Sequence, residues 1–118
     1  PMVNQARIYP GFPFNDNLYC ANEHNIQTEA FLPPMNDVIL NSNELTIFAN
    51  KYHTTPRAIA TRYHLEKDCI SLCSGKNEDE LRQCFEAFNF DISDTDMKFL
   101  DAMKNYGPEN INPDTCSF

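Results

Sequence analysis

The residues best placed for chemistry lie in the turn Ser74–Asn77. A short apolar segment, 69–73, precedes this turn, and a segment with helical periodicity follows it. Gly75 permits a tight turn between them, and the first N–H groups of a helix, at the positive end of its dipole, bind anions. This pattern predicts a phosphate-binding site that includes Ser74, Gly75, Lys76 and Asn77.

Cysteines and histidines are the other reactive residue types. The cysteines are Cys20, Cys69, Cys73, Cys84 and Cys116. On a strand, Cys69 and Cys73 share a face but lie about 13 Å apart at ~3.3 Å per residue, too far to share one metal ion. We therefore predict buried free thiols in a reducing cytosol. His24 and His53 fall at helix ends and His64 has no partner at metal-ligand spacing, so all three are interpreted as structural or surface residues.

Composition limits the class of protein. The chain has 118 residues, a net charge of −8 and a pI near 4.6, which argues against nucleic-acid binding and against anionic membrane surfaces. No apolar run reaches the roughly 20 residues of a spanning helix and no secretory signal pattern begins the chain, so the cytoplasm is the predicted location. Because the chain starts at Pro1 without Met, we expect a fragment or a processed product.

Three strands alternate with helices along the chain. The strands are expected at 2–9, 26–31 and 69–73, and Asn25 suits a left-handed helix end before the second strand. The first strand is stopped by Pro10-Gly11 and the second by Pro33-Pro34. Alternation of this kind predicts a parallel sheet, whose two outer strands would be left unpaired in a three-stranded piece.

Helices are predicted from apolar spacing and from start signals. The first helix spans 18–24, and the next carries the stripe Leu45, Phe48, Ala49 and Tyr52. Thr55 and Pro56 begin a helix whose inward side is Ile59, Ala60 and Tyr63. Asn77 and Glu80 resemble a capping box before the stripe Leu81, Cys84, Phe85 and Phe88. A last helix starts at Ser93 and runs through Met97, Leu100 and Met103.

Several motifs, in order, resemble the aldo-keto reductase family from about Met2 to Met103. They are Val3-Asn4-Gln5 with Pro10, Asn22–Ile26, Ala30–Pro33, Thr55–Leu65, and Leu81 with Phe88-Asn89-Phe90 and Ser93. The resemblance implies an α/β fold, a partial (β/α)8 TIM barrel of about three βα units plus a C-terminal helix. Residues 1–104 would form units six to eight, and 105–118 a C-terminal tail. A whole barrel needs about 250 residues.

The resemblance also implies an NAD(P)H-dependent oxidoreductase that interconverts carbonyls and alcohols. The family's catalytic Asp, Tyr, Lys and His belong to earlier units, so no catalytic residue is assigned here and the chain alone is predicted inactive. Its expected ligands are a nicotinamide dinucleotide and, in the complete barrel, a small carbonyl substrate. The alternative is a non-catalytic partial barrel that self-associates or binds a partner through its exposed strand edges.

The matched positions imply a cofactor wall. Gln5 falls where the family binds the nicotinamide carboxamide, although a polar barrel-interior residue is the alternative interpretation. Phe31 replaces the Tyr that stacks on the nicotinamide ring. The turn Ser74–Asn77, with Glu80 and Gln83, falls where the family holds the adenosine end and its 2′-phosphate.

At that end the sequence departs from the family pattern. The usual Lys and Arg become Ser74 and Glu80, and Glu78, Asp79 and Glu80 would repel a phosphate. Lys76 is the only cation expected nearby, and one flexible Lys does not replace a guanidinium clamp. The family's Pro-Leu-Gly becomes Pro33-Pro34-Met35, and Glu and His on the first strand become Arg7 and Tyr9. We therefore predict weak or absent NADPH binding, with either NADH in its place or a decayed cofactor site.

Overall fold

A parallel three-stranded sheet lies at the centre of the protein, a computed structural model that describes residues 3–32, 37–73 and 76–106. The strands are β1 (Val3–Arg7), β2 (Gln27–Phe31) and β3 (Ile70–Ser71), in the order β1-β2-β3. Ala6 is paired with Ala30, and Ala30 is paired in turn with Ser71. The predicted parallel sheet is confirmed, although the third strand is shorter than the segment 69–73.

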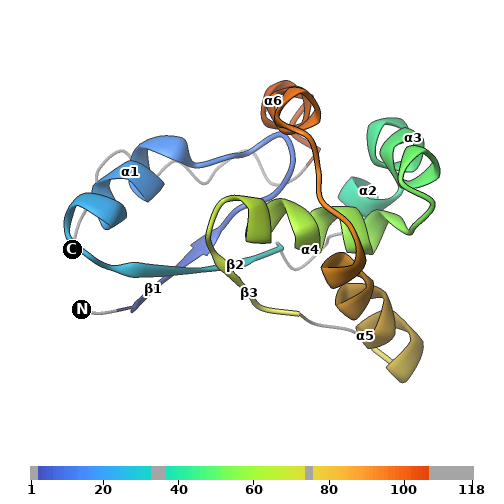
Figure 1. Ribbon diagram of the computed structural model, residues 1–118, viewed down its shortest axis with the longest axis horizontal. Coiled ribbons are helices and arrows are strands. Elements are labelled where there is room, and N and C mark those ends of the chain that lie inside the picture. Colours follow the sequence, from blue (N-terminus) through green and yellow to red (C-terminus); the bar gives the residue numbers. More distant parts are fainter. Residues whose placement is uncertain (1–2, 33–36, 74–75, 107–118) are drawn as a thin grey trace.

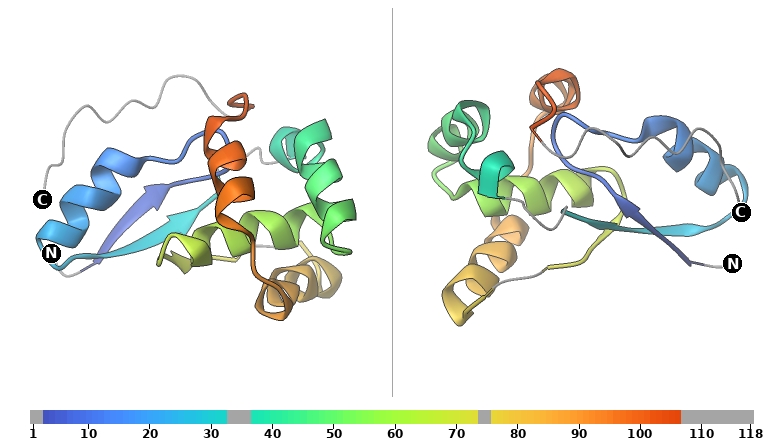
Figure 2. Two further views of the ribbon diagram at one scale, coloured as in Figure 1. Left: turned by 45° about the horizontal axis from the view of Figure 1, so that its top comes forward. Right: turned by 180° about the vertical axis from the view of Figure 1, so that it is seen from behind.

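Helices connect the strands and follow the last one. They are α1 (Asn15–Glu23), α2 (Asp37–Leu40), α3 (Asn43–Lys51), α4 (Pro56–Glu66), α5 (Glu78–Phe85), the 3-10 helix η1 (Glu86–Asn89) and α6 (Asp94–Ala102). The long helix α4 lies beside the sheet, while α1 and α5 lie at opposite ends of the molecule (Figures 1 and 2). The four-residue helix α2 was not predicted, and the residues just before it, 33–36 with Pro33-Pro34, lie outside the described residues.

The predicted start signals of the helices are confirmed. Thr55 accepts a hydrogen bond from the Ala58 N–H, Asn77 from the Glu80 N–H, and Ser93 from the Asp96 N–H. A side-chain oxygen at this position satisfies one of the first N–H groups, which lack partners within the helix. Asn25 has a φ of 56°, as its place after the helix predicts.

The core lies between α4 and the outer face of the sheet. Ile59, Ala60 and Tyr63 are fully buried, as the spacing predicted. Leu45, Phe48 and Ala49 of α3 and Leu100 of α6 complete the apolar cluster. The packing fixes α4 behind the strands, so that the opposite face of the sheet is free to meet a ligand.

A buried histidine joins α4 to β3 and to the residue that follows β1. The His64 Nε2 atom lies 2.6 Å from the Ile8 carbonyl oxygen, which can only accept, so Nε2 carries the proton. Its Nδ1 atom then accepts from the Ser71 hydroxyl at 2.7 Å. Burial is the main cause that lowers the pKa of His64 from 6.5 to about 4, so the imidazole is neutral near pH 7.

The predicted apolar stripe of α5 is wrong at three of its four positions. Leu81, Phe85 and Phe88 are 39%, 66% and 67% exposed, whereas Cys84 and the unpredicted Ala87 are buried. The α-helix changes to the 3-10 helix η1 at Glu86, which alters the angle between successive side chains. The small Cys84 and Ala87 face α4 instead, which leaves both phenylalanines on the surface.

The prediction of buried free thiols holds at Cys69 and Cys84. Cys73 is free but exposed, and Cys20 is disulfide-bonded, so the prediction is wrong at both, while Cys116 lies outside the described residues. Within the described residues no cluster of His, Cys, Asp and Glu could hold a metal ion. The helices of the described ranges are too short and too polar to cross a membrane.

Candidate functional site

The candidate nicotinamide wall is the face of β1 and β2 that points away from the core. Alternate residues of a strand point to opposite faces, and the alanines Ala6 and Ala30 are buried toward the helices. The pairs on either side of the alanines are Gln5 with Glu29 and Arg7 with Phe31. These four side chains therefore share the free face, near the carboxyl ends of the strands where barrel enzymes build their sites.

Gln5 is held in place by a neighbour on the next strand. Its Nε2 atom donates to the Glu29 Oε1 atom at 3.1 Å. Gln5 is exposed, so its amide oxygen and second N–H remain accessible to a ligand as well. The alternative interpretation was a polar residue whose hydrogen bonds are made within the protein. The bond to Glu29 fits that interpretation for one N–H of the amide.

Phe31 is the last residue of β2 and is half-buried. The Arg7 guanidinium carbon lies 6.0 Å from the centroid of its ring, a cation–π contact across the strand pair. The Arg7 Nε atom is buried and has no hydrogen-bond partner. The sequence alone identified Arg7 only as a departure from the family pattern, and its position beside Phe31 became visible in the register of the strands.

The described part of the turn expected at the adenosine end is Lys76-Asn77, directly before α5. Side chains of the turn and of the helix accept hydrogen bonds from backbone N–H groups there. Asn77 accepts from the Glu80 N–H at 2.9 Å, and one Glu80 carboxylate oxygen accepts from the Lys76 N–H. The predicted capping box is therefore present in a modified form, with the acid reaching the residue before the cap. Ser74 and Gly75 lie outside the described residues.

Arg57 is a second cation at this turn, so the expectation that Lys76 stands alone is wrong. An Arg57 guanidinium nitrogen lies 3.6 Å from the second Glu80 carboxylate oxygen, and the Arg57 side chain is only 10% exposed. The two residues are far apart in sequence and meet because α4 packs against α5. No local pattern in the sequence pointed to this pairing.

Gln83 lies one turn further along α5. Its Nε2 atom donates to the Asp79 carboxylate at 3.2 Å, a contact within the helix. Lys76, Asn77 and Glu80 are thus brought together at the start of α5, whereas Gln83 lies further along the helix. Gln5 and Phe31 form a separate group on β1 and β2. The third strand of the sheet, β3, is the element that precedes α5 in the chain.

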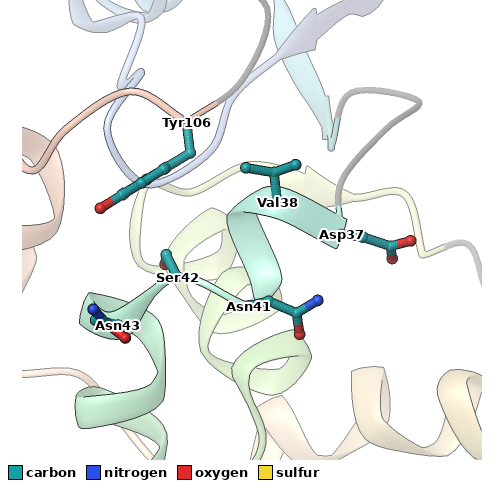
Figure 3. A pocket seen from close by; sticks show the side chains of 6 residues that line it. All are labelled: Asp37, Val38, Asn41, Ser42, Asn43 and Tyr106. Atoms are coloured by element: carbon teal, nitrogen blue, oxygen red, sulfur yellow. The ribbon is translucent and has the colours of Figure 1, made fainter.

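A shallow hollow of about 410 Å³ lies between α2 and the start of the C-terminal tail. It is lined by Asp37, Val38, Asn41, Ser42, Asn43 and Tyr106 (Figure 3). The Tyr106 hydroxyl donates to the Glu44 carboxylate, with oxygen distances of 3.0 and 3.1 Å, which fixes the ring above α3. The hollow follows β2, at the same end of the sheet as Phe31.

Comparison with known proteins identifies the class. The model of the Aldo/keto reductase family matches residues 13–105, and the chain belongs to this family. The partial TIM barrel of three parallel strands with helices agrees with that assignment. The expected family and fold are therefore confirmed.

The similar proteins are longer than this chain. The glyoxal reductase of Bacillus subtilis is 28% identical, and the match covers 100% of this chain and 43% of that protein. The mouse aldo-keto reductase family 1 member C18 is 33% identical over 86% of this chain and 32% of its own length. A solved structure of a Gox0644 mutant in complex with NADPH has a TM-score of 0.83 and 27% identity, over 100% of this chain and 44% of that one. The chain thus spans less than half the length of these relatives.

Proposed function

We propose that this chain forms the cofactor-side wall of an NAD(P)H-dependent oxidoreductase that interconverts carbonyls and alcohols. The observation that carries the proposal is the placement of Gln5 and Phe31 on one free face of neighbouring parallel strands. The amide can donate to and accept from a carboxamide, and the ring offers a stacking surface. One similar protein of known structure holds NADPH, which supports a nicotinamide dinucleotide as the ligand.

The chain is proposed to bind the 2′-phosphate of NADPH weakly. Glu80 occupies the Lys76 N–H with one carboxylate oxygen and faces Arg57 with the other. A phosphate at this turn would compete with that carboxylate and would meet Glu78 and Asp79 in the same helical turn. NADH, which lacks the 2′-phosphate, is the better fit.

The reducing chemistry is proposed to need residues beyond this chain. The acid that protonates the carbonyl oxygen accounts for roughly 10²–10⁴-fold of rate, and we assign no residue here to that role. The wall binds and orients the nicotinamide, which supplies the hydride when bound. The chain alone is accordingly expected to bind cofactor without turnover.

A test of the wall measures NADH binding to the parent chain and to Phe31→Ala. Loss of the stacking surface should weaken binding by about 3–10-fold. Because the chain has no Trp, the fluorescence of the reduced nicotinamide can be followed directly. Phe31→Tyr should retain binding, since it keeps the ring.

The matched control is Phe88→Ala, which removes an exposed phenylalanine from η1. It should leave the NADH dissociation constant unchanged. Equal affinities for the parent chain and Phe31→Ala would count against the nicotinamide wall.

The second candidate is a non-catalytic module that self-associates. Within the described residues β1 and β3 each pair with one strand only, and Val3 and Ile70 on these strands are 49% and 48% exposed. Unpaired strand edges with apolar residues favour pairing with another chain. A concentration-dependent dimer by sedimentation, without NADH binding, would favour this candidate over the oxidoreductase.

A further inference from the structure

We propose that Arg7 binds the carboxylate of an anionic carbonyl substrate beside the nicotinamide wall. The inference rests on the proposed function for the carbonyl and the cofactor. The anion-binding role of Arg7 itself rests on the geometry of β1 and β2.

The Arg7 side chain faces the region where the substrate would lie. It is the last residue of β1, it pairs in register with Phe31, and it shares the free face with Gln5. Catalytic and binding residues of barrel enzymes lie at this end of the strands. A group held by Arg7 would therefore lie next to a ring stacked on Phe31.

The charge of Arg7 is not matched by a described neighbour. Glu29 is the acid of the same face, but its carboxylate accepts from Gln5, and no ion pair joins it or any other described acid to Arg7. The Arg7 Nε atom is buried without a hydrogen-bond partner. A buried donor without a partner is costly, and a ligand oxygen would satisfy it once the guanidinium turns out from its covered position.

The chemistry of guanidinium favours a carboxylate as this ligand. Nε and a terminal nitrogen of an arginine form a planar pair of donors that matches the two oxygens of a carboxylate. The adenosine-side turn follows β3, two strands away from β1, or about 10 Å at ~4.8 Å per strand. The substrate carboxylate is therefore a better match for Arg7 than the adenosine phosphate.

The contact between Arg7 and Phe31 gives the site a second property. The guanidinium lies over the ring on which the nicotinamide would stack. A carboxylate that binds Arg7 would draw the guanidinium away from the ring and so free the ring for the nicotinamide. Anionic substrate and nicotinamide cofactor should therefore favour each other.

The test compares two probes that differ in charge, 4-carboxybenzaldehyde and methyl 4-formylbenzoate. Binding to the full chain is measured by ligand-observed NMR in the presence of NADH. The carboxylate probe should bind about tenfold more tightly than the ester to the parent chain. Arg7→Met should abolish this preference, and Arg7→Lys should keep part of it.

The control variant is Arg82→Met, which removes an exposed arginine from α5. It changes the net charge by the same amount and should preserve the preference. Circular dichroism of each variant establishes that it is folded, and Arg7→Gln replaces Arg7→Met if the latter is not. Equal affinity for the two probes in the parent chain, or an unchanged preference in the folded Arg7 variants, would overturn the inference.

Two further measurements separate this inference from the proposed function. If NADH does not bind but the carboxylate preference depends on Arg7, the cofactor wall is wrong and the anion site stands. If NADH binds and the preference is absent, the anion site is wrong and the wall stands. Displacement of the carboxylate probe by inorganic phosphate at lower concentration than by acetate would also overturn the assignment to a carboxylate.

Discussion

The proposed nicotinamide wall and the turn before α5, where we propose the adenosine end, use their polar groups in opposite ways. On the wall, Gln5 and Phe31 lie on a free face, and Arg7 beside them has a donor without a partner. At the turn, Glu80 takes the Lys76 N–H and faces Arg57. A helix start whose N–H groups are satisfied by its own side chains is stable, and we expect the same contacts to oppose a bound phosphate.

The wall also depends on the packing behind it, and the largest expected effect tests that dependence. Because the pKa of His64 is about 4 in the fold and 6.5 when unfolded, the unfolded chain binds more protons between these values. Stability is full above pH 6.5 and falls as the pH drops toward 4, by about 3 kcal/mol in total. Urea unfolding at a series of pH values measures this loss.

The variant His64→Gln should flatten the pH dependence in that window. Its amide can donate to the Ile8 carbonyl and accept from Ser71 without titrating. His24→Gln, at an exposed histidine, should keep the pH profile of the parent chain. A parent chain whose unfolding free energy is constant from pH 6.5 to 4 would contradict the buried neutral imidazole.

The variant Glu80→Arg tests whether the Glu80 carboxylate is what keeps a phosphate from the turn. This variant removes the competing carboxylate and places a guanidinium next to Arg57, so that a phosphate could bridge both. The ratio of NADPH affinity to NADH affinity should rise about tenfold. Isothermal titration with both cofactors measures the ratio.

Glu78→Arg is the matched control for that change. It alters the net charge equally in the same helical turn, but Glu78 is exposed and Glu80 carries the described contact with Arg57. The control should shift the ratio much less. If both variants raise it equally, the effect is general electrostatic attraction and the role given to the Glu80 carboxylate is wrong.

The smallest expected effect on stability is at Gln5. Gln5→Ala removes one exposed hydrogen bond to Glu29 and should change the unfolding free energy by no more than about 0.5 kcal/mol. NADH binding should weaken nevertheless, because the carboxamide loses its partner. By comparison, Ile59→Ala in the core should cost about 2–5 kcal/mol. A large loss of stability in Gln5→Ala would show that Gln5 is a structural residue and would contradict its proposed role in cofactor binding.

Patterns that act over a few residues predicted much of the fold. Thr55, Asn77 and Ser93 were identified as helix starts because capping depends on a side chain and an N–H three residues away. The parallel sheet followed from the alternation of strands and helices. The exposure of Phe85 was not predicted, since the side of α5 that becomes covered depends on how this helix packs against α4.

The sequence by itself determined the family, the order of the three strands and the strands that carry Gln5 and Phe31, because motif spacing and periodicity are local properties of a chain. Only the tertiary structure decided which side chains meet across elements. Arg7 reaches Phe31 through strand register, Arg57 reaches Glu80 through helix packing, and His64 joins α4 to β3 and to the residue that follows β1. Such contacts depend on how distant segments are brought together, and no local spacing in the sequence encodes them.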